Sequence, residues 1–319
     1  MVMVKYSILI PVYNGAKYIE KCLDSALEQD YKNYEVIVIN DGSTDETESI
    51  IKRYSSPKLK YYYQDNEGVS NARNKAISYA KGEFFTFLDS DDYLTKDALT
   101  IIDAKIDSDI DLLSFNICVV NKYKEPIYHV QKPVFSNLNG EQAIIKFIEK
   151  TQLFDTPVSY VYRTAYFREN KFLYAPNRVH EDFGLTPLVI LNAKQVMAIG
   201  HTLYYYVITD RSLTRSNNPI EIKQRAWDML YHFDYLYLNI NNNLQIEEKT
   251  KKILNNFIAL ELLKKIKELK GKVLKEYLYE IKNRKVLKLI NQKGLKNKLL
   301  VLLTSIAPKI GSKVILRKK

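Results

Sequence analysis

The chain has 319 residues and a formal net charge of +11, with 46% hydrophobic and 27% charged residues. This composition is ordinary for a globular protein of one large or two smaller domains, and it excludes a low-complexity chain. Two cysteines without CxxC spacing, Cys22 and Cys118, give no support for a disulfide framework or a zinc site, so we expect both to be reduced and buried.

The positive charge is concentrated near the C-terminus. Residues 249–319 contain 21 Lys and Arg against 4 Asp and Glu, whereas residues 1–248 contain 27 against 33. Opposite charge in two parts of a chain predicts two different roles. The basic part is suited to nucleic acid, an anionic membrane or an acidic substrate, but the acidic part is unlike a nucleic-acid-binding protein.

No segment is typical of a secretory leader or of a membrane span. Residues 1–5 run directly into a β-rich stretch, and no stretch approaches the ~18 apolar residues that a spanning helix requires. We therefore expect the protein to act in the cytoplasm.

The first ninety residues alternate between strand-like and helix-like segments. Strands are predicted at 6–12, 34–39, 59–63 and 83–88, and helices at 16–29, 43–54 and 70–80. Ser43 and Glu46 form the pattern of a capping box at the start of the second helix. The alternation predicts a mostly parallel sheet flanked by helices.

From residue 95 onward the pattern is mixed and then helical. Helices are predicted at 95–106, 139–150 and 183–191, and β-rich segments at 111–120, 127–135 and 203–208. Asn139 and Gln142 form a second capping box. After Pro219 the chain reads as three or four helices. We therefore expect an α/β domain over 1–218 and a basic helical region over 219–319.

Polar residues follow three of the predicted strands where each one ends, and the clearest group is Asp89-Ser90-Asp91-Asp92. The carboxyl ends of parallel strands meet at one edge of a sheet, where ligands bind. Hard carboxylate oxygens suit Mg²⁺ or Mn²⁺, which would neutralise a diphosphate. Alternatively, the acids only start a loop and cap the next helix.

The two other groups lie at the ends of the first and second strands. Asp41 could accept hydrogen bonds from a base or a ribose, or only form an Asx-turn before a helix. Tyr13 offers a ring on which a nucleobase could stack, although Pro11 is also typical of a simple loop.

Four motifs occur in a fixed order: Pro11-Val12-Tyr13-Asn14, the segment NDGSTD at 40–45, the segment NEGVSNARN at 66–74, and LDSDD at 88–92. Together they resemble family 2 glycosyltransferases with the GT-A fold, closely over 5–95 and more weakly to about 215. The resemblance implies a Rossmann-like nucleotide-binding half at 1–95 and an acceptor-binding half at 96–218. It also implies a nucleoside-diphosphate sugar donor, often UDP-linked, and transfer with inversion.

The resemblance assigns donor binding to seven residues: Pro11, Val12, Tyr13, Asp41, Arg73, Asp89 and Ser90. The first three form the base-binding edge, Asp41 contacts uracil, and Asp89 contacts the ribose or the sugar. Asp91 or Asp92 is implied as the ligand of Mn²⁺ or Mg²⁺, with Asp91 preferred.

An inverting transferase needs a general base, and His180-Glu181-Asp182-Phe183 resembles the Glu-Asp motif of the family. The family assigns the base to the aspartate, so Asp182 is the candidate and Glu181 the alternative. The other interpretation is that two acids stabilise a helix N-terminus through its dipole.

Arg211 and Arg215 lie in a stretch that, in many relatives, covers the diphosphate, and arginines there could clamp phosphate oxygens. Many relatives have a histidine or arginine where this chain has Val207-Ile208. This departure weakens the assignment of the two arginines.

The C-terminal segment has an apolar stripe with lysines around it, formed by Leu295, Leu299, Leu302, Ile306 and Ile310. Pro308 interrupts the last turn. Such a stripe suits a helix that lies on the inner face of an anionic membrane, or else core packing or a homodimer contact. Lipid-linked acceptors, common in the family, would fit membrane docking.

The expected function is metal-dependent transfer of a hexosyl or N-acetylhexosaminyl group to a hydroxyl of a saccharide or lipid-linked saccharide in cell-surface glycan synthesis. A dinucleotide-dependent oxidoreductase is disfavoured because no GxGxxG follows the first strand. The alternatives are a catalytically silent donor-binding or scaffold subunit, and membrane or nucleic-acid binding through the basic tail, with nucleic acid disfavoured.

Overall fold

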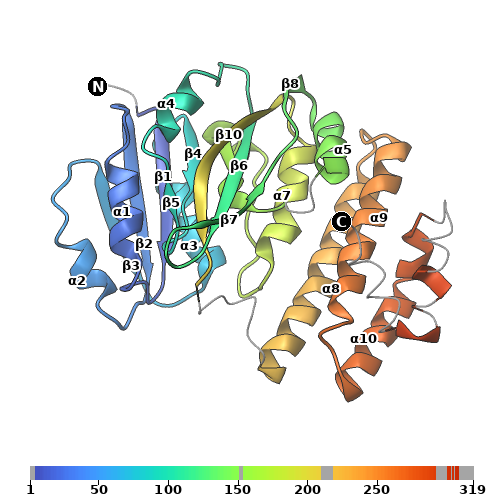
Figure 1. The fold of residues 1–319 in the computed structure, drawn as a ribbon. Helices are drawn as coiled ribbons and strands as arrows, with labels where there is room; N and C mark the ends of the chain where they lie inside the picture. The colour runs from blue at the N-terminus through green and yellow to red at the C-terminus, as the bar shows by residue number, and fades with distance from the viewer. Residues whose placement is uncertain are drawn as a thin grey trace. The chain divides into compact units, whose positions relative to one another are not determined.

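The computed structural model describes residues 4–150, 154–209, 218–291, 300–302, 304 and 306–308 (Figure 1). The chain forms two compact units, one of residues 1–177 with 181–212 and the other of 178–180 with 213–319. The predicted boundary lies after residue 218, and no sequence signal placed Arg178–His180 with the C-terminal helices.

The first unit is built on one sheet, which over the described residues has ten strands in the order β3-β2-β1-β4-β9-β6-β10-β5, with β7 beside β6 and β8 beside β10. Its first four strands are parallel to one another: β1 (Tyr6–Val12), β2 (Tyr34–Asp41), β3 (Leu59–Gln64) and β4 (Phe84–Phe87). The predicted α/β fold, a central sheet flanked by helices and followed by a helical region, is confirmed.

The second half of the sheet is mixed. β6 (Leu112–Val120) and β10 (Val196–Val207) are parallel, and β9 (Tyr160–Arg163) lies antiparallel between β4 and β6. The short strands β5 (Tyr93–Leu94), β7 (Pro126–Val130) and β8 (Phe135–Leu138) are antiparallel additions. The stretch predicted at 127–135 thus divides into β7 and β8, and β5 and β9 were not predicted.

β1 and β2 form the centre of the core, and every residue of both is buried. Helices on both faces of a parallel sheet leave no solvated side, which is why these strands read as nearly continuous apolar runs. Pro11 is tolerated in β1 because its nitrogen lies beyond the point where β4 ends: the last bond between the two runs from the Leu88 amide to the Leu9 carbonyl.

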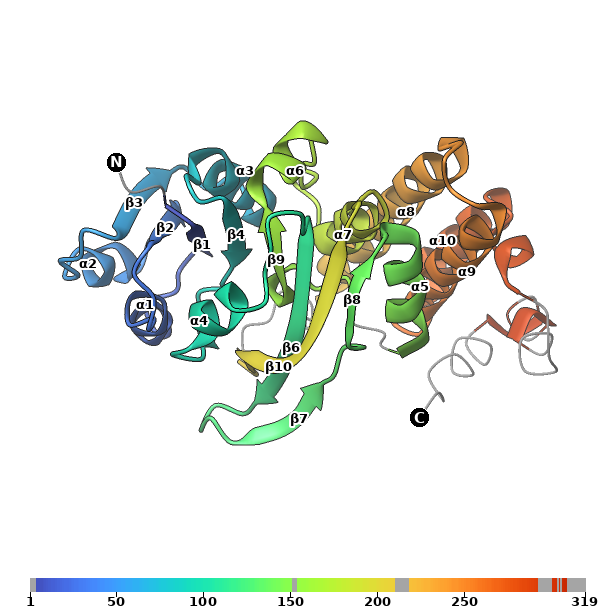
Figure 2. The same cartoon turned by 90° about the horizontal axis from the view of Figure 1, so that it is seen from above.

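Helices cover both faces of the sheet, as Figure 2 shows. One face carries α1 (Ile19–Leu27) and α4 (Ala98–Asp103), and the other carries α3 (Val69–Tyr79) and α6 (Thr164–Glu169). The remaining helices of this unit are α2 (Thr47–Ile51), α5 (Gly140–Lys150), α7 (Glu181–Leu191) and the 3₁₀ turn η1 (Pro157–Ser159).

The two predicted capping boxes had different outcomes. Asn139 and Gln142 form the expected reciprocal pair, each side chain accepting from the other's backbone amide. The box at Ser43 and Glu46 was wrong, because Ser43 Oγ instead accepts from the Asn14 amide, and Asp45 accepts from the Thr47 amide at the start of the short α2. The Asx-type interaction of Asp45 competes with the box.

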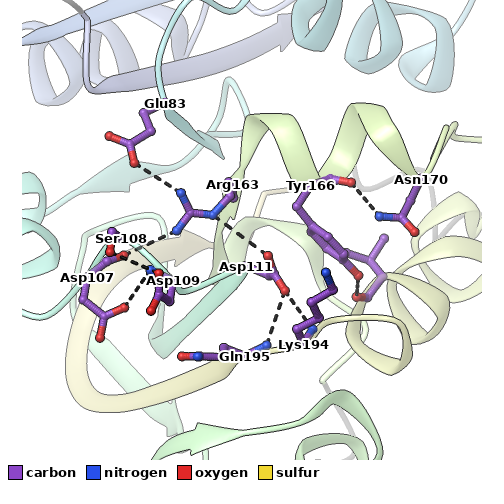
Figure 3. Close-up of polar contacts among 11 residues, drawn as sticks. Glu83, Asp107, Ser108, Asp109, Asp111, Arg163, Tyr166, Asn170, Lys194 and Gln195 are labelled. Carbon is purple, nitrogen blue, oxygen red and sulfur yellow. Dashed lines mark hydrogen bonds and ion pairs between the residues drawn. The ribbon is translucent and has the colours of Figure 1, made fainter.

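The edge of the sheet opposite the polar motifs is held together by Arg163, the last residue of β9 (Figure 3). Its guanidinium lies 3.2 Å from the Glu83 carboxylate and 3.9 Å from that of Asp111. Asp111 also accepts from the backbone amides of Lys194, at 2.7 Å, and Gln195, at 3.3 Å. Because Glu83, Asp111 and Gln195 immediately precede β4, β6 and β10, this network fixes the starts of three strands.

The second unit contains α8 (Pro219–Asn242), α9 (Glu248–Lys265), α10 (Gly271–Asn283) and the 3₁₀ turn η3 (Val286–Leu289). α8 begins as predicted, with Pro219 in its first turn and the Asn218 side chain accepting from the Ile220 amide. Its core contains Phe233, Leu236 and Ile240 of α8. None of the helices described in the chain has the length and apolarity to cross a bilayer.

Candidate active site

The loops after β1 and β2 are fixed to one another by Asn14. Its amide donates to Ser43 Oγ at 2.9 Å, and its Oδ1 accepts from the Thr44 amide at 2.8 Å. Gly42 has a φ of +72°, and a Cβ there would lie 2.6 Å from the Asn66 amide nitrogen, so this position requires glycine. Tyr13, the neighbour of Asn14, is 51% exposed, which leaves its side chain accessible at this edge.

Asp41, at the end of β2, is buried and makes three hydrogen bonds. It accepts from Gln64 Nε2 at 2.7 Å and from the amides of Glu67 and Gly68, both at 2.9 Å. These bonds shape the turn that leads into α3. Asp41 therefore lies at the predicted place, with its carboxylate already engaged by the polypeptide.

Arg73 of α3 brings the aspartate cluster and the Glu-Asp motif together. Its guanidinium is buried, donates to Asp89 at 3.0 Å, and forms a second ion pair with Glu181. It also lies 5.6 Å from the ring centroids of Phe87 and Tyr174. The sequence predicted only a donor-binding role for Arg73, and its ion pair with Glu181 was not predicted.

Asp91 and Asp92, in the loop after β4, have different hydrogen-bond partners. Asp92 is buried, and its carboxylate accepts from the Tyr204 hydroxyl at 2.5 Å and from the Val207 amide at 2.7 Å. The Tyr204 oxygen in turn accepts from the Asp89 amide at 3.2 Å. Asp92 thus anchors the loop to β10, a role that the sequence did not reveal.

Asp91 stays closer to solvent than Asp92, with Thr209 donating to its carboxylate at 3.3 Å. Burial and the neighbouring Asp89 carboxylate raise the pKa of Asp91 to about 6. Three carboxylates crowded at one strand end repel one another, an arrangement that a divalent cation relieves. In the described part of the chain no three His, Cys, Asp or Glu side chains group as a metal site, so a cation here would need ligands from the diphosphate.

Glu181 and Asp182 open α7, and only Glu181 is paired with a cation among the described residues. Asp182 accepts a 2.8 Å hydrogen bond from the Phe183 amide. Burial, followed by repulsion from Glu181 and Asp155, raises the pKa of Asp182 well above its usual range. A raised pKa makes the ionised carboxylate a stronger base, which suits it to accept a proton from a substrate.

Arg211 and Arg215 lie outside the described residues, so the predicted phosphate contacts stay predictions. Ser90 is partly exposed and lies beside Gly15, which belongs to the loop after β1. Cys22 and Cys118 are buried and free, as expected. Tyr174 and Thr209 were missed, because single aromatic and hydroxyl residues carry no motif, and the contact of Tyr204 with Asp92 was not predicted.

A family model described as Glycosyl transferase family 2 matches residues 7–171. Glycosyltransferase GlyA of Streptococcus pneumoniae is 32% identical over 227 residues, which cover 66% of this chain and 32% of that protein. Poly(ribitol-phosphate) beta-N-acetylglucosaminyltransferase TarS of Staphylococcus aureus is 32% identical over 214 residues, covering 64% and 35%. The chain thus aligns with about a third of the length of these relatives.

Two solved structures share the fold. TarS 1–349 of S. aureus in complex with UDP-GlcNAc has a TM-score of 0.71 at 23% identity and covers 97% of this chain and 89% of that chain. The mannosyltransferase PcManGT of Pyrobaculum calidifontis, in complex with GDP-Man and Mn²⁺, has a TM-score of 0.56 at 15% identity and covers 98% and 85%.

Proposed function

Because the chain belongs to glycosyl transferase family 2, we propose that it transfers a sugar, with inversion, from a UDP-sugar to a hydroxyl of a saccharide or lipid-linked saccharide in cell-surface glycan synthesis. The observation that carries the proposal is the Arg73 bridge between Asp89 and Glu181. It brings the strand-end donor motif and the Glu-Asp motif into one site while leaving Asp182 without a cation in the described part of the chain.

The donor is proposed to lie across the carboxyl ends of β1, β2 and β4. Tyr13 offers its exposed ring to the base, Asp41 lies at the next strand end, and Asp89 and Ser90 face the ribose or the sugar. UDP is the proposed nucleotide because the fold is similar to that of TarS solved with UDP-GlcNAc. Pro11 and Val12 would supply the backbone beside the base.

Asp91 is the proposed ligand of Mn²⁺ or Mg²⁺, since Asp92 is already bonded to Tyr204 and Val207. A bound divalent cation would neutralise the charge on the leaving diphosphate. Arg211 and Arg215 are kept as proposed phosphate contacts.

The proposed chemistry uses Asp182 as the general base. The acceptor O–H bond breaks as its proton passes to the Asp182 carboxylate, and the acceptor oxygen forms a bond to the anomeric carbon. Attack comes from the face opposite the diphosphate, whose bond to that carbon breaks and releases UDP. Glu181 is the less suitable base because it is held by Arg73.

A panel of nucleotide-sugars that starts with UDP-GlcNAc, each with Mn²⁺ or Mg²⁺, tests the proposal through UDP release. We expect Asp182→Asn to lower turnover by at least about 100-fold while donor binding persists. Asp91→Ala should abolish the metal-dependent part of donor binding. The exposed Asp109→Asn, at the opposite edge of the sheet, is the control. Equal turnover in wild type and both site variants would reject the roles of Asp182 and Asp91, whereas donor binding by wild type without UDP release would favour a catalytically silent binding subunit.

We also propose that the basic C-terminal segment docks the enzyme on the cytoplasmic face of an anionic membrane, where a lipid-linked acceptor would be presented. Leu302 and Ile306 are 53% and 74% exposed, whereas Leu300 and Thr304 are buried. Two members of the predicted apolar stripe therefore face solvent, and the other three lie outside the described residues. Lysines at 296, 298, 309 and 313 flank the stripe in sequence.

A further inference from the structure

The three residues before the Glu-Asp motif belong to the second unit. Arg178–His180 pack with the C-terminal helices, and the chain returns to the first unit at Glu181. His180 has a φ of +63°, in the left-handed region that L-residues with large side chains rarely adopt. A backbone conformation of this kind persists only where surrounding contacts enforce it.

Asp228 of α8 supplies the first of these contacts. Its side chain is completely buried and accepts from Arg178 Nη1 at 2.7 Å and from the Val179 amide at 3.0 Å. Gln224, one turn earlier on α8, donates to both carboxylate oxygens at 2.9 and 3.0 Å. Asp228 is therefore fixed by its own helix and holds two consecutive residues of the segment.

His232 and Lys265 hold the rest of the segment. His232 Nε2 lies 3.0 Å from the Val179 carbonyl oxygen, which can only accept, so this nitrogen carries the proton. Lys265 of α9 lies 3.0 Å from His180 Nε2. Burial, with the Lys265 charge, lowers the pKa of His180 to about 3, so a neutral ring accepts from the ammonium group. Each of the three residues is thus contacted from α8 or α9.

We propose that α8 and α9 act as a positioning device for the general base, in which Asp228, His232 and Lys265 hold residues 178–180 and thereby fix the backbone that leads to Asp182. The proposal rests on the proposed role of Asp182 as the base. Only Glu181 separates the held segment from Asp182, and Glu181 is itself fixed by Arg73. Asp182 therefore comes two residues after the held segment and directly after a residue that Arg73 holds.

The test compares two aspartates on α8 that both pair with arginine. Asp228→Asn weakens the hold on Arg178 and Val179, whereas Asp234→Asn weakens only the pair with Arg284 at 2.7 Å. The donor is the UDP-sugar that wild type uses in the nucleotide-sugar panel. With it, we expect Asp228→Asn to lower kcat by about 10- to 100-fold, because small misplacements of a reacting group have effects of this size. The dissociation constant of the donor should change less than about 2-fold, and Asp234→Asn should leave both values unchanged.

A second pair of variants separates positioning from folding. His232→Gln keeps an N–H that reaches the Val179 carbonyl and should retain most of kcat, whereas His232→Leu keeps the volume and should lose it. Hydrogen exchange at the amides of 179–183 should rise in Asp228→Asn and His232→Leu only. Unchanged kcat and unchanged hydrogen exchange in both Asp228→Asn and His232→Leu would overturn the proposal. If Asp182→Asn is also fully active, the proposed function itself fails, whereas an inactive Asp182→Asn beside an active Asp228→Asn rejects the positioning role alone.

Discussion

Asp182 and Glu181 are adjacent carboxylates with opposite electrostatic surroundings. Glu181 is paired with the buried Arg73, whereas Asp182 has neighbouring carboxylates and no paired cation in the described residues. Burial and the neighbouring carboxylates therefore raise the proton affinity of Asp182. Burying the Asp182 carboxylate near other carboxylates lowers the free energy of unfolding, a cost that is common in active sites.

This difference predicts stability effects of opposite sign for Asp182→Asn and Glu181→Gln. The pKa of Asp182 is raised above the unfolded value of about 3.9, so between these two pKa values the native state holds a proton that the unfolded state has released. Wild type therefore loses stability as pH rises through the folded pKa, and Asp182→Asn does not. We expect Asp182→Asn to melt above wild type, with a gap that widens as pH rises.

The matched variant Glu181→Gln removes a partner of buried Arg73 and should melt below wild type at neutral pH. Thermal unfolding of the three proteins at several pH values measures both effects. A Tm of Asp182→Asn at or below that of wild type across the range would contradict the strained position of Asp182.

The site could be predicted from the sequence only as far as its motifs extend. Asp41, Asp89 and Asp91 follow buried strands that are visible as apolar runs, so their common edge could be inferred before any coordinates. The inward turn of Asp92 could not, because it depends on Tyr204, which lies more than a hundred residues away. The bridge from Arg73 to Glu181 likewise joins residues that only the folded sheet brings together.

At the scale of secondary structure, prediction succeeded where local pattern decides the element. β1 was placed at its observed bounds and β2, β3 and α3 within two residues at either end. β1 and β2 are buried on both faces and therefore appear as apolar runs, and β3 is rich in tyrosine. β9 was missed because it has only four residues, three of them buried, and no alternation to detect between β4 and β6. α2 was predicted too long, since the Asp45 cap starts it later than Ser43 would.

The Arg163 network predicts a stability effect that is separate from catalysis. Asp111→Ala removes the acceptor of the Lys194 and Gln195 amides at the start of β10, and removes a partner of Arg163 (Figure 3). Leaving such groups unpaired should reduce the free energy of unfolding by about 1–3 kcal/mol. Chemical denaturation measures this value.

The control for Asp111→Ala is Asp109→Ala, whose exposed side chain contacts only Ser108 among the described residues and should change stability by less than about 0.5 kcal/mol. Because the network lies at the edge of the sheet opposite the aspartate cluster, the folded Asp111→Ala protein should keep its kcat. A loss of kcat without a loss of stability would show that this edge communicates with the site.

At the scale of the whole molecule, charge is distributed unevenly along the chain. Residues 1–248 carry an excess of acids, and residues 249–319 an excess of 17 positive charges. An excess of cations in one segment favours attraction of that segment to an anionic surface. The proposed membrane docking would therefore act through the C-terminal part of the chain.

Membrane docking predicts that binding to vesicles requires both anionic lipid and the exposed apolar stripe. The unmodified chain should sediment with vesicles that contain about a third anionic lipid and not with neutral ones, and raising salt from about 0.1 M to about 0.5 M should release it. Leu302→Glu with Ile306→Glu should abolish binding, because these exposed side chains would enter the interface. Ile220→Glu, at a 79% exposed position outside the stripe, should bind as wild type does. If the double variant instead converts a dimer to a monomer and binds vesicles normally, the stripe is a contact between two copies of the chain.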